Sequence, residues 1–578
     1  MKKKTEKITN NQLFTEAGEA LPEIPWNVYP RPQMRREEWL CLNGAWDFYR
    51  QDKEPQKIIV PFCPESLLSG IREPLRYGEA LRYERKFTIP DSWRKKRILL
   101  HLGAVNRVSE IRVNGRLISF HLRGYLPITE DITRALLPGE NTVSVSVVND
   151  LFSRYALGKQ KVKRGGMWYT PVSGIWQTVW LEPVPEHYID ELVIESDMKG
   201  ATIRAEGVSE GTVRLNEKRY LLRNGEARIE PEDPHLWSPE DPYLYEFTLN
   251  TGEDRVTSYF ALREIRAGEA DGIPRILLNG KPYFFNGLLD QGYYSDGLFT
   301  PADPKLFEED ILKMKALGFN TLRKHIKVEA EQFYYDCDRL GMVVFQDMVN
   351  HGEYHYFRDT VLPTLGFKKR KDRRYNRDEE TRREFLNFME ETVFALRNHP
   401  SILYWTIFNE GWGQFDADEA YRKLRALDKS RLIDATSGWF RQEKSDVESE
   451  HIYFKKLKLG KKSGRPQVLS EFGGFVYKIP EHSFNLDKTY GYKLFATREE
   501  FAADFRRIYL EEVIPLAKQG LSAAIYTQLS DVEDETNGLL TYDRRVQKLE
   551  ASETEGIIEA LQAAVNGTAP EKTENGEA

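Results

Sequence analysis

Two short segments of this sequence combine residue types that could carry out acid–base chemistry. Residues 405–411 read Trp-Thr-Ile-Phe-Asn-Glu-Gly, and residues 468–474 read Val-Leu-Ser-Glu-Phe-Gly-Gly. Each is an apolar run that ends in a carboxylate, as expected where a buried parallel strand delivers a functional side chain to a cleft. A pair of such glutamates, Glu410 and Glu471, predicts hydrolysis of a sugar linkage.

Retaining glycoside hydrolysis requires two carboxyl groups in different protonation states. One attacks the anomeric carbon while the other protonates the departing oxygen, at a separation of about 5 to 5.5 Å. The acid must stay protonated in apolar surroundings, whereas the nucleophile must stay ionised beside hydrogen-bond donors and positive charge. We expect Glu410 to be the acid and base, because Asn409 beside it could hold a sugar hydroxyl while Trp405 and Trp412 supply apolar surface. Glu471 is then the nucleophile by elimination.

The elements that must position these residues follow Gly268, where strands begin to alternate with amphipathic helices. Eight strands are expected, at residues 284–290, 321–325, 343–348, 403–410, 432–437, 447–454, 467–471 and 523–530. Helical patterns lie between them, at residues 303–317, 329–340, 379–398 and 417–427. This count predicts a catalytic (β/α)8 TIM barrel over residues 269–565, with Glu410 closing strand four and Glu471 closing strand seven. The carboxyl ends of barrel strands line the active face, so the two side chains can converge.

Two all-β domains are expected before the barrel. Residues 25–185 contain short alternating runs separated by turn residues, which is the pattern of a β-sandwich. Residues 186–268 contain a second set of short strand-like runs, which fits a small immunoglobulin-like β-sandwich. The polar tail, residues 566–578, is expected to be disordered. The sequence therefore predicts a multi-domain protein, in keeping with its length of 578 residues.

Composition argues against several classes of function. The net charge of −7 and the pI near 6.0 give no reason to expect nucleic acid as a partner. No apolar run is long enough to span a membrane, and the basic residues 1–4 are not followed by the apolar core of a signal peptide, so we expect a cytoplasmic protein. Three scattered cysteines are expected to be free thiols: Cys41, Cys63 and Cys337. The histidines show no metal-binding spacing, so neither a metal nor a cofactor is expected.

A series of short motifs runs along the chain in a specific order. It includes Leu-Asn-Gly-Ala-Trp at residues 42–46, Val-Ser-Gly-Ile-Trp-Gln at 172–177, Gly-Phe-Asn-Thr-Leu-Arg at 318–323 and Asn-His-Pro-Ser-Ile at 398–402. Through these motifs the chain resembles glycoside hydrolase family 2, the group of β-galactosidases, β-glucuronidases and β-mannosidases. The resemblance implies a sugar-binding jelly-roll sandwich of the galactose-binding-like kind, an immunoglobulin-like sandwich and a catalytic barrel.

The resemblance also implies roles for individual residues. Asn409 and Glu410 match the family's acid/base motif, and Glu471 matches its nucleophile. His325 corresponds to a substrate-contacting histidine, and Tyr453 falls where the family has a tyrosine that hydrogen-bonds the nucleophile. Further substrate-binding positions are expected at Arg323, Asp290, Trp439, Tyr526 and Gln528.

Strand eight departs from the family's pattern. The family usually has a tryptophan there as part of the sugar platform, but this chain has Tyr526, with Gln528 two residues later. The β-glucuronidases recognise the sugar carboxylate with an Asn-x-Lys pair, and the matching positions here are Glu535 and Asn537. The lysine is missing and Glu535 would repel an anion, which favours a neutral sugar. Asp290, closing strand one, could contact sugar or pair with a barrel arginine, and pairing is favoured.

Two basic segments point the other way. Residues 368–374 and 455–462 are rich in Lys and Arg, and positive charge near the active face could attract an acidic substrate, although solvated surface charge is the commoner explanation. We therefore expect a retaining exo-β-glycosidase with a carbohydrate substrate. β-Galactosidase is the leading candidate, with β-glucuronidase or β-mannosidase behind it. A non-catalytic carbohydrate-binding protein is the alternative of another class, and homo-oligomerisation stays open.

Overall fold

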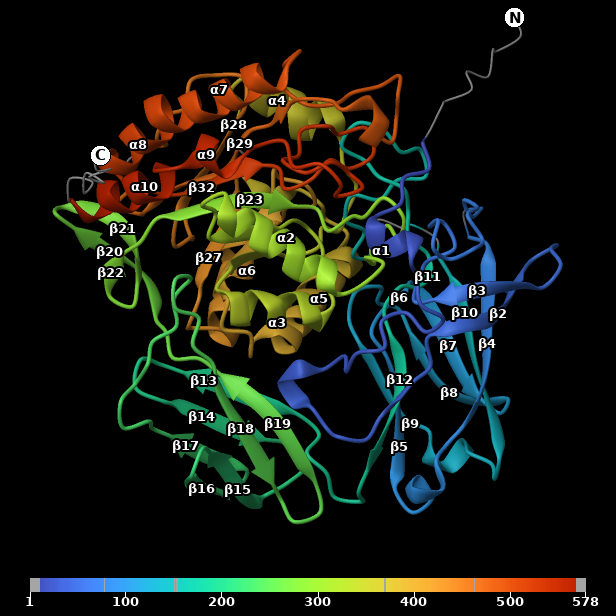
Figure 1. Cartoon of the computed structure of the whole chain (residues 1–578). Coiled ribbons are helices and arrows are strands. Elements are labelled where there is room, and N and C mark those ends of the chain that lie inside the picture. The colour runs from blue at the N-terminus through green and yellow to red at the C-terminus, as the bar shows by residue number, and fades with distance from the viewer. Residues whose placement is uncertain are drawn as a thin grey trace, which may run out of the picture.

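The computed structural model describes residues 11–567, except residues 77, 150, 152–153, 368–370 and 462. Within that range the chain forms a β-sandwich, a smaller antiparallel sheet domain and a barrel (Figure 1). The basic start and most of the polar tail lie outside the described residues, as do parts of both basic segments. Among the described residues, no helix combines the length and apolar character that crossing a bilayer requires.

The amino-terminal sandwich consists of two antiparallel sheets. One has the order β1-β12-β5-β9, with bounds Leu40–Cys41, Val179–Val184, Arg97–Leu102 and Ile128–Asp131. The other has the order β3-β2-β4-β10-β7-β8, with bounds Gln56–Val60, Gly44–Arg50, Ala80–Thr88, Glu140–Val148, Val108–Val113 and Arg116–His121. Strand β10 buries every second side chain, as its alternating sequence predicts, and these side chains join a shared core that includes Trp46 and Tyr83.

The second domain is a sheet of seven antiparallel strands in the order β13-β14-β17-β16-β15-β18-β19. The strands have the bounds Leu192–Ser196, Ala201–Ala205, Glu226–Ile229, Lys218–Arg223, Glu210–Leu215, Tyr245–Asn250 and Arg255–Phe260. Its apolar side chains form a core of their own around Phe247 and Phe260. A three-stranded sheet, β20 to β22, then leads into the barrel, with bounds Ile265–Ala270, Ile273–Leu278 and Lys281–Pro282.

Eight parallel strands form the barrel in the order β27-β26-β25-β24-β23-β32-β29-β28. In chain order, β23 to β29 and β32 have the bounds Phe285–Asp290, Thr321–Lys324, Val343–Asp347, Ile402–Asn409, Leu432–Ser437, Glu448–Ile452, Gln467–Gly473 and Leu521–Thr527. At the open seam, Ser449 of β28 donates a hydrogen bond to the Thr436 carbonyl of β27, 3.4 Å away, so the barrel is nearly closed. All eight predicted strands are present, and the predicted fold class is confirmed.

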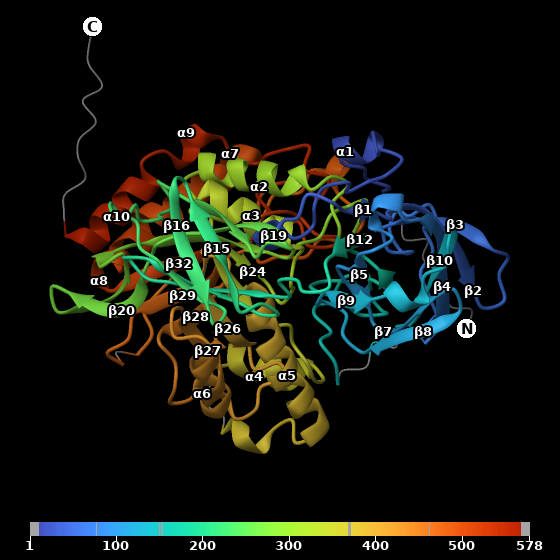
Figure 2. The same cartoon turned by 90° about the horizontal axis from the view of Figure 1, so that it is seen from below.

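Helices cover the outside of the barrel (Figure 2). The longer ones are α2 (Lys305–Ala316), α3 (Glu331–Leu340), α5 (Glu379–Leu396), α6 (Ala417–Leu427), α7 (Arg498–Ile508) and α10 (Ile557–Asn566). Asp378 caps α5 by accepting a hydrogen bond from the Thr381 amide, and Gly341 ends α3 in the left-handed conformation. The described part of the connection after β28 contains no helix, in line with its short length.

A loop of the sandwich, residues 158–170, reaches the mouth of the barrel; it is called the sandwich loop below. The Leu157 amide at its start donates to the carbonyl of Asn350, which follows β25, at 3.0 Å. At its far end, the Thr170 amide donates to Glu533 at 2.9 Å, and Arg164 lies 3.3 Å from the Asp534 carboxylate. These contacts fix the sandwich loop against the segment that follows β32.

Candidate active site

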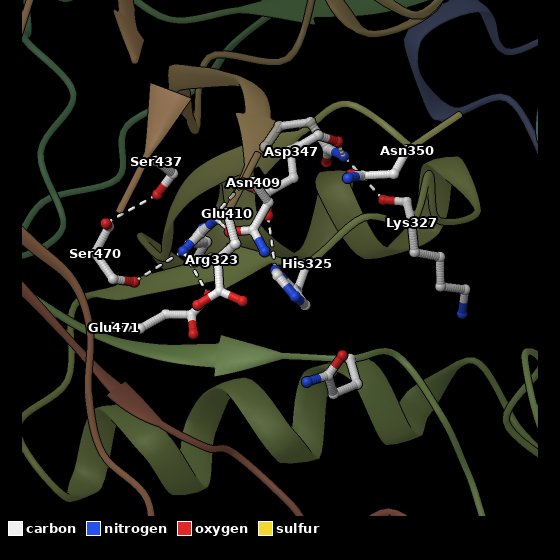
Figure 3. Close-up of polar contacts among 12 residues, drawn as sticks. Arg323, His325, Lys327, Asp347, Asn350, Asn409, Glu410, Ser437, Ser470 and Glu471 are labelled. Atoms are coloured by element: carbon white, nitrogen blue, oxygen red, sulfur yellow. Dashed lines mark hydrogen bonds and ion pairs between the residues drawn. The ribbon is translucent and has the colours of Figure 1, made fainter. Parts of the chain in front are cut away.

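Glu410 and Glu471 meet in one pocket at the carboxyl-terminal end of the barrel strands. Glu410 follows β26 directly with a positive φ of 51°, and Glu471 lies in β29 beside a break in the strand's register. The two carboxylates point toward one another (Figure 3). Together with a ring nitrogen of His451, their nearest oxygens lie within 4.8 Å of one another. A non-glycine residue rarely adopts positive φ, so the fold holds Glu410 in a specific, mildly strained place.

The pocket is lined by the ends of the barrel strands, by the segments that follow them and by the sandwich loop. The lining residues are Lys159, Met167, Trp168, Leu289, Gln291, His325, Ile326, Tyr354, Asn409, Glu410, Trp412, Tyr453, Glu471, Tyr492, Thr527 and Glu535. Both candidate catalytic carboxylates therefore face the same space.

Glu471 is surrounded by donors and positive charge. Arg323 Nη1 lies 3.1 Å from one carboxylate oxygen, and the Tyr453 hydroxyl donates to the other. The ring of Tyr453 is held by stacking on Tyr492, with centroids 3.8 Å apart. Burial alone would raise the pKa of Glu471, but the charges of His451 and Arg323 outweigh it and hold that pKa below its usual range. Glu471 is therefore ionised at neutral pH, as a nucleophile must be.

Arg323 of β24 organises the floor of the site. Its side chain is 1% exposed, and its guanidinium contacts Asp347 at 3.0 Å, Asn409 at 2.8 Å and the Ser470 carbonyl at 2.9 Å (Figure 3). Because the amide oxygen of Asn409 accepts from Arg323, its amide nitrogen remains to donate to a substrate. Arg323 itself is not among the residues that line the pocket. It therefore orients Asn409 and Glu471 from behind the pocket wall.

His325 presents a hydrogen-bond acceptor to the pocket. Its Nδ1 lies 2.8 Å from Asp347 Oδ2 (Figure 3). Burial would raise the pKa of Asp347, but Arg323 keeps it low, so the ionised Asp347 accepts the proton of Nδ1. Burial lowers the pKa of His325 to about 4, which keeps the ring neutral near pH 7. Nε2 then carries no proton and can accept a hydrogen bond from a sugar hydroxyl.

Glu410 lies between an aromatic wall and His451. Its side chain is 18% exposed, and its carboxylate is 2.8 Å from His451 Nδ1. On the other side, Trp168 of the sandwich loop packs edge-to-face on Trp412, with ring centroids 5.2 Å apart, and on Tyr354 at 5.0 Å. These aromatic side chains line the pocket together with Glu410, so the wall offers a surface on which an apolar group could pack beside that carboxylate.

Two further ionisable side chains, Lys159 and Glu535, also line the pocket. The Tyr169 hydroxyl of the sandwich loop donates to Glu535, and Gln528 Nε2 lies 3.5 Å from the same oxygen. Burial raises the pKa of Glu535, and the charge of Lys159 opposes this rise. The charge of Lys159 also helps to lower the pKa of Glu471, after those of His451, Arg323 and His325. Within the described part of the chain, Lys159 has no ion-pair partner.

Comparison with known families agrees with this architecture domain by domain. Residues 70–185 match the model of the glycosyl hydrolases family 2 sugar binding domain, residues 192–263 match that of glycosyl hydrolases family 2, and residues 273–473 match that of the family's TIM barrel domain. The chain belongs to glycosyl hydrolase family 2. It is therefore a glycoside hydrolase, and the resemblance seen in its motifs is confirmed.

Several family 2 relatives can be compared over most of the chain. A β-glucuronidase of Paenibacillus borealis is 26% identical over 456 residues, covering 70% of this chain and 73% of that protein. A β-galactosidase of Thermoanaerobacter pseudethanolicus is 22% identical over 488 residues, covering 78% and 62%. Among solved structures, a β-D-glucuronidase from Dictyoglomus thermophilum superposes with a TM-score of 0.71 at 19% identity, over 94% of this chain and 99% of that one. This superposition supports the shared fold.

The structure brings three of the expected substrate-binding residues into the pocket of this family 2 protein, namely Asn409, His325 and Tyr453. Others lie outside the lining. Asp290 pairs with Lys324 at 2.6 Å, so its partner is a lysine rather than the expected arginine. Trp439 is buried with its ring 6.1 Å from that of His451.

Strand eight does not place its aromatic side chain where a sugar platform would be. Tyr526 is fully buried among Phe472, Phe475 and Phe505, because it points between the strands and the helices rather than into the barrel mouth. Gln528 lies behind the pocket, where its amide accepts from Gln291 at 2.9 Å and donates to Asn537 at 2.9 Å. Neither residue lines the pocket.

The basic segments also stay outside the pocket, as far as the structure describes them. Their described members are exposed, with Lys371, Arg373 and Arg374 in one segment and Lys455, Lys456, Lys458 and Lys461 in the other. None of these lines the pocket, and Lys368, Lys369, Arg370 and Lys462 lie outside the described residues. Among the described residues that line the pocket, the lysine is instead Lys159 of the sandwich loop, which the strand and helix pattern of the barrel could not indicate.

Proposed function

We propose that the protein is a retaining exo-β-glycosidase that works by double displacement through a covalent glycosyl-enzyme intermediate. The observation that carries this proposal is the approach of Glu410 and Glu471, whose nearest carboxylate oxygens lie within 4.8 Å in one pocket. Retaining enzymes need about 5 Å between these groups, whereas inverting enzymes need about 6.5 to 9.5 Å to admit a water molecule.

In the first step, a carboxylate oxygen of Glu471 attacks the anomeric carbon while Glu410 gives its proton to the glycosidic oxygen. The bond between that oxygen and the anomeric carbon breaks, and the leaving group departs as an alcohol. In the second step, Glu410 takes a proton from water, whose oxygen attacks the anomeric carbon and releases Glu471 as a carboxylate. Tyr453 and Arg323 hold the nucleophile in place through both steps.

β-Glucuronides are the first candidate substrates. The relative from Paenibacillus borealis carries the name β-glucuronidase. The sequence argument against an acidic sugar rested on a missing lysine, and Lys159 of the sandwich loop supplies an ammonium group to the same pocket. The raised pKa of Glu535, caused by burial, reduces the charge with which it would repel a sugar carboxylate.

β-Galactosides are the second candidate. A relative from Thermoanaerobacter pseudethanolicus carries the name β-galactosidase. Glu535 lines the pocket and receives hydrogen bonds from Tyr169 and Gln528, which favour its ionised form. An ionised Glu535 and Lys159 in the same pocket would cancel in charge, which suits the hydroxyl groups of a neutral sugar.

A panel of aryl β-glycosides tests the proposal. The folded protein is mixed with the glucuronide, galactoside, glucoside and mannoside of nitrophenol, and release of nitrophenol is followed. For the preferred substrate, NMR then identifies the anomer that forms first. A β-anomer is expected, whereas an α-anomer would contradict double displacement. A protein that cleaves none of these substrates, yet melts at a higher temperature with the free sugars, would be a carbohydrate-binding protein instead.

A further inference from the structure

One buried histidine, His451 of β28, lies between the two candidate catalytic carboxylates. Its Nδ1 is 2.8 Å from a Glu410 oxygen and 3.5 Å from a Glu471 oxygen. Its Nε2 is 3.1 Å from the Ser437 hydroxyl and 3.5 Å from Arg323 Nη1. Among the described residues, Glu410, His451 and Glu471 form the one group of three side chains that is close enough to share an ion.

The ring of His451 is held in this orientation by its surroundings. Its side chain is fully buried, and a Cβ at Gly438 would approach the ring to 2.6 Å, so the strand end after β27 is shaped to admit an imidazole. The Ser437 hydroxyl donates to the Ser470 hydroxyl at 2.8 Å, which leaves a Ser437 lone pair to accept from Nε2. Nε2 therefore faces the Ser437 hydroxyl and Arg323, and Nδ1 faces the carboxylates.

The number of protons between His451 Nδ1 and the Glu410 carboxylate limits the protonation states that this pair can adopt. An oxygen and a nitrogen 2.8 Å apart in a buried site form a hydrogen bond, which needs one proton between them. With a neutral ring, the proton lies either on a Glu410 carboxyl group that donates to Nδ1 or on Nδ1, which donates to a Glu410 carboxylate. With a charged ring, Nδ1 donates to a Glu410 carboxylate. Either way, the pair holds one proton at the position from which a glycosidic oxygen would be protonated.

We infer that His451 is a positioning residue that holds the transferable proton jointly with Glu410. This inference rests on the proposed function. In the first step the shared proton moves to the glycosidic oxygen as its bond to the anomeric carbon breaks, and in the second step a proton from water returns to the pair. The charged groups that face the ring are Glu410, one residue after β26, Glu471 from β29 and Arg323 from β24.

The variant His451→Asn separates proton sharing from simple packing. Asparagine can place an amide near the position of Nδ1 and so keep a hydrogen bond to Glu410, but it cannot take up a proton. We expect the alkaline limb of kcat/KM to move to lower pH. At pH 8 the loss should be about 10-fold or more with a poor leaving group such as phenol, and under about 3-fold with dinitrophenol, which needs little protonation.

A matched control is His121→Asn in the sandwich. His121 also lies 3.0 Å from a glutamate, Glu130, but far from the pocket, so this variant should leave the pH profile and the leaving-group dependence unchanged. Equal losses with both leaving groups in His451→Asn would show a packing role and overturn the inference. An unchanged alkaline limb would overturn it as well.

A second measurement does not depend on turnover. ¹⁵N NMR of histidine-labelled protein, with His451 assigned by difference from His451→Asn, reports whether Nδ1 takes part in a hydrogen bond. The signal should shift on Glu410→Gln, which removes a titratable partner, and not on Glu130→Gln. If no glycoside is cleaved but this shift appears, the proposed function fails and the proton-sharing pair stands. If the ¹⁵N signal of His451 is the same in wild type and Glu410→Gln, the proton is not shared between His451 and Glu410, and the inference is refuted.

Discussion

Replacing Lys159 by methionine tests which sugar the pocket accepts. Methionine keeps most of the length and the apolar stem of lysine but removes the ammonium group, so the sandwich loop should retain its contacts with the barrel. The backbone of this loop is held independently, since the Tyr169 amide donates to the Lys159 carbonyl at 2.9 Å. The variant should therefore change the charge of the subsite and little else.

The size of the effect follows from the partner that the ammonium group would gain. A hydrogen bond to a charged group contributes about 1.5 to 3 kcal/mol, and each 1.4 kcal/mol is about tenfold in kcat/KM. Lys159→Met should lower kcat/KM for a glucuronide by about 10- to 150-fold. For a galactoside, whose hydroxyl could bind water or Glu535 instead, the loss should be several-fold smaller.

Glu535→Gln provides the opposite perturbation in the same place. It removes the negative charge but can still accept from Tyr169, so kcat/KM for the glucuronide should rise relative to that for the galactoside. The assay is the ratio of the two kcat/KM values in wild type and both variants, at one pH and ionic strength. If both variants change the glucuronide-to-galactoside ratio of kcat/KM in the same direction, or leave it unchanged, Lys159 and Glu535 do not recognise the sugar carboxylate.

Three further predictions concern roles and stability. Glu471→Gln should abolish turnover with every leaving group, whereas Glu410→Gln should lose about 10²- to 10⁴-fold with natural leaving groups and far less with dinitrophenol; the reverse pattern would exchange their roles. Arg36→Met should lower the free energy of unfolding by about 3 to 5 kcal/mol in urea titrations, because it strands two buried carboxylates, Glu182 at 2.8 Å and Asp254 at 2.7 Å. Burial lowers the pKa of His101 and His325 to about 4 and that of His351 to about 3. The unfolded chain then binds more protons below about pH 6.5, so the urea midpoint should fall as pH drops toward 4; a flat profile would contradict this.

Much of the barrel could be predicted from the sequence, because its strands are buried on both faces and read as continuous apolar runs between amphipathic helices. The expected strand at residues 432–437 and the expected helix at 417–427 match β27 and α6 at both ends. The ends of other strands shifted by a few residues, since a strand ends where pairing stops rather than where apolar residues stop. Glu410, expected at a strand end, lies one residue beyond β26.

The site was only partly predictable. Strand-end carboxylates indicated Glu410 and Glu471, and alternation along β28 could have indicated His451, because residues two apart on a strand face the same side and Tyr453 was already expected in the site. Lys159 and Trp168 could not be found this way. They belong to a different domain. The strand and helix periodicity of the barrel sequence does not indicate which loop of another domain will contact the barrel mouth.

Since the sandwich loop carries Lys159 and Trp168 into the pocket, excision of the first domain would leave a barrel with both glutamates but with one wall removed. The pocket is thus built from two domains, because the barrel supplies both glutamates and the sandwich supplies Lys159 and Trp168. Exchanging residues 158–170 between homologues is accordingly a route to altered substrate preference that leaves the reacting groups untouched.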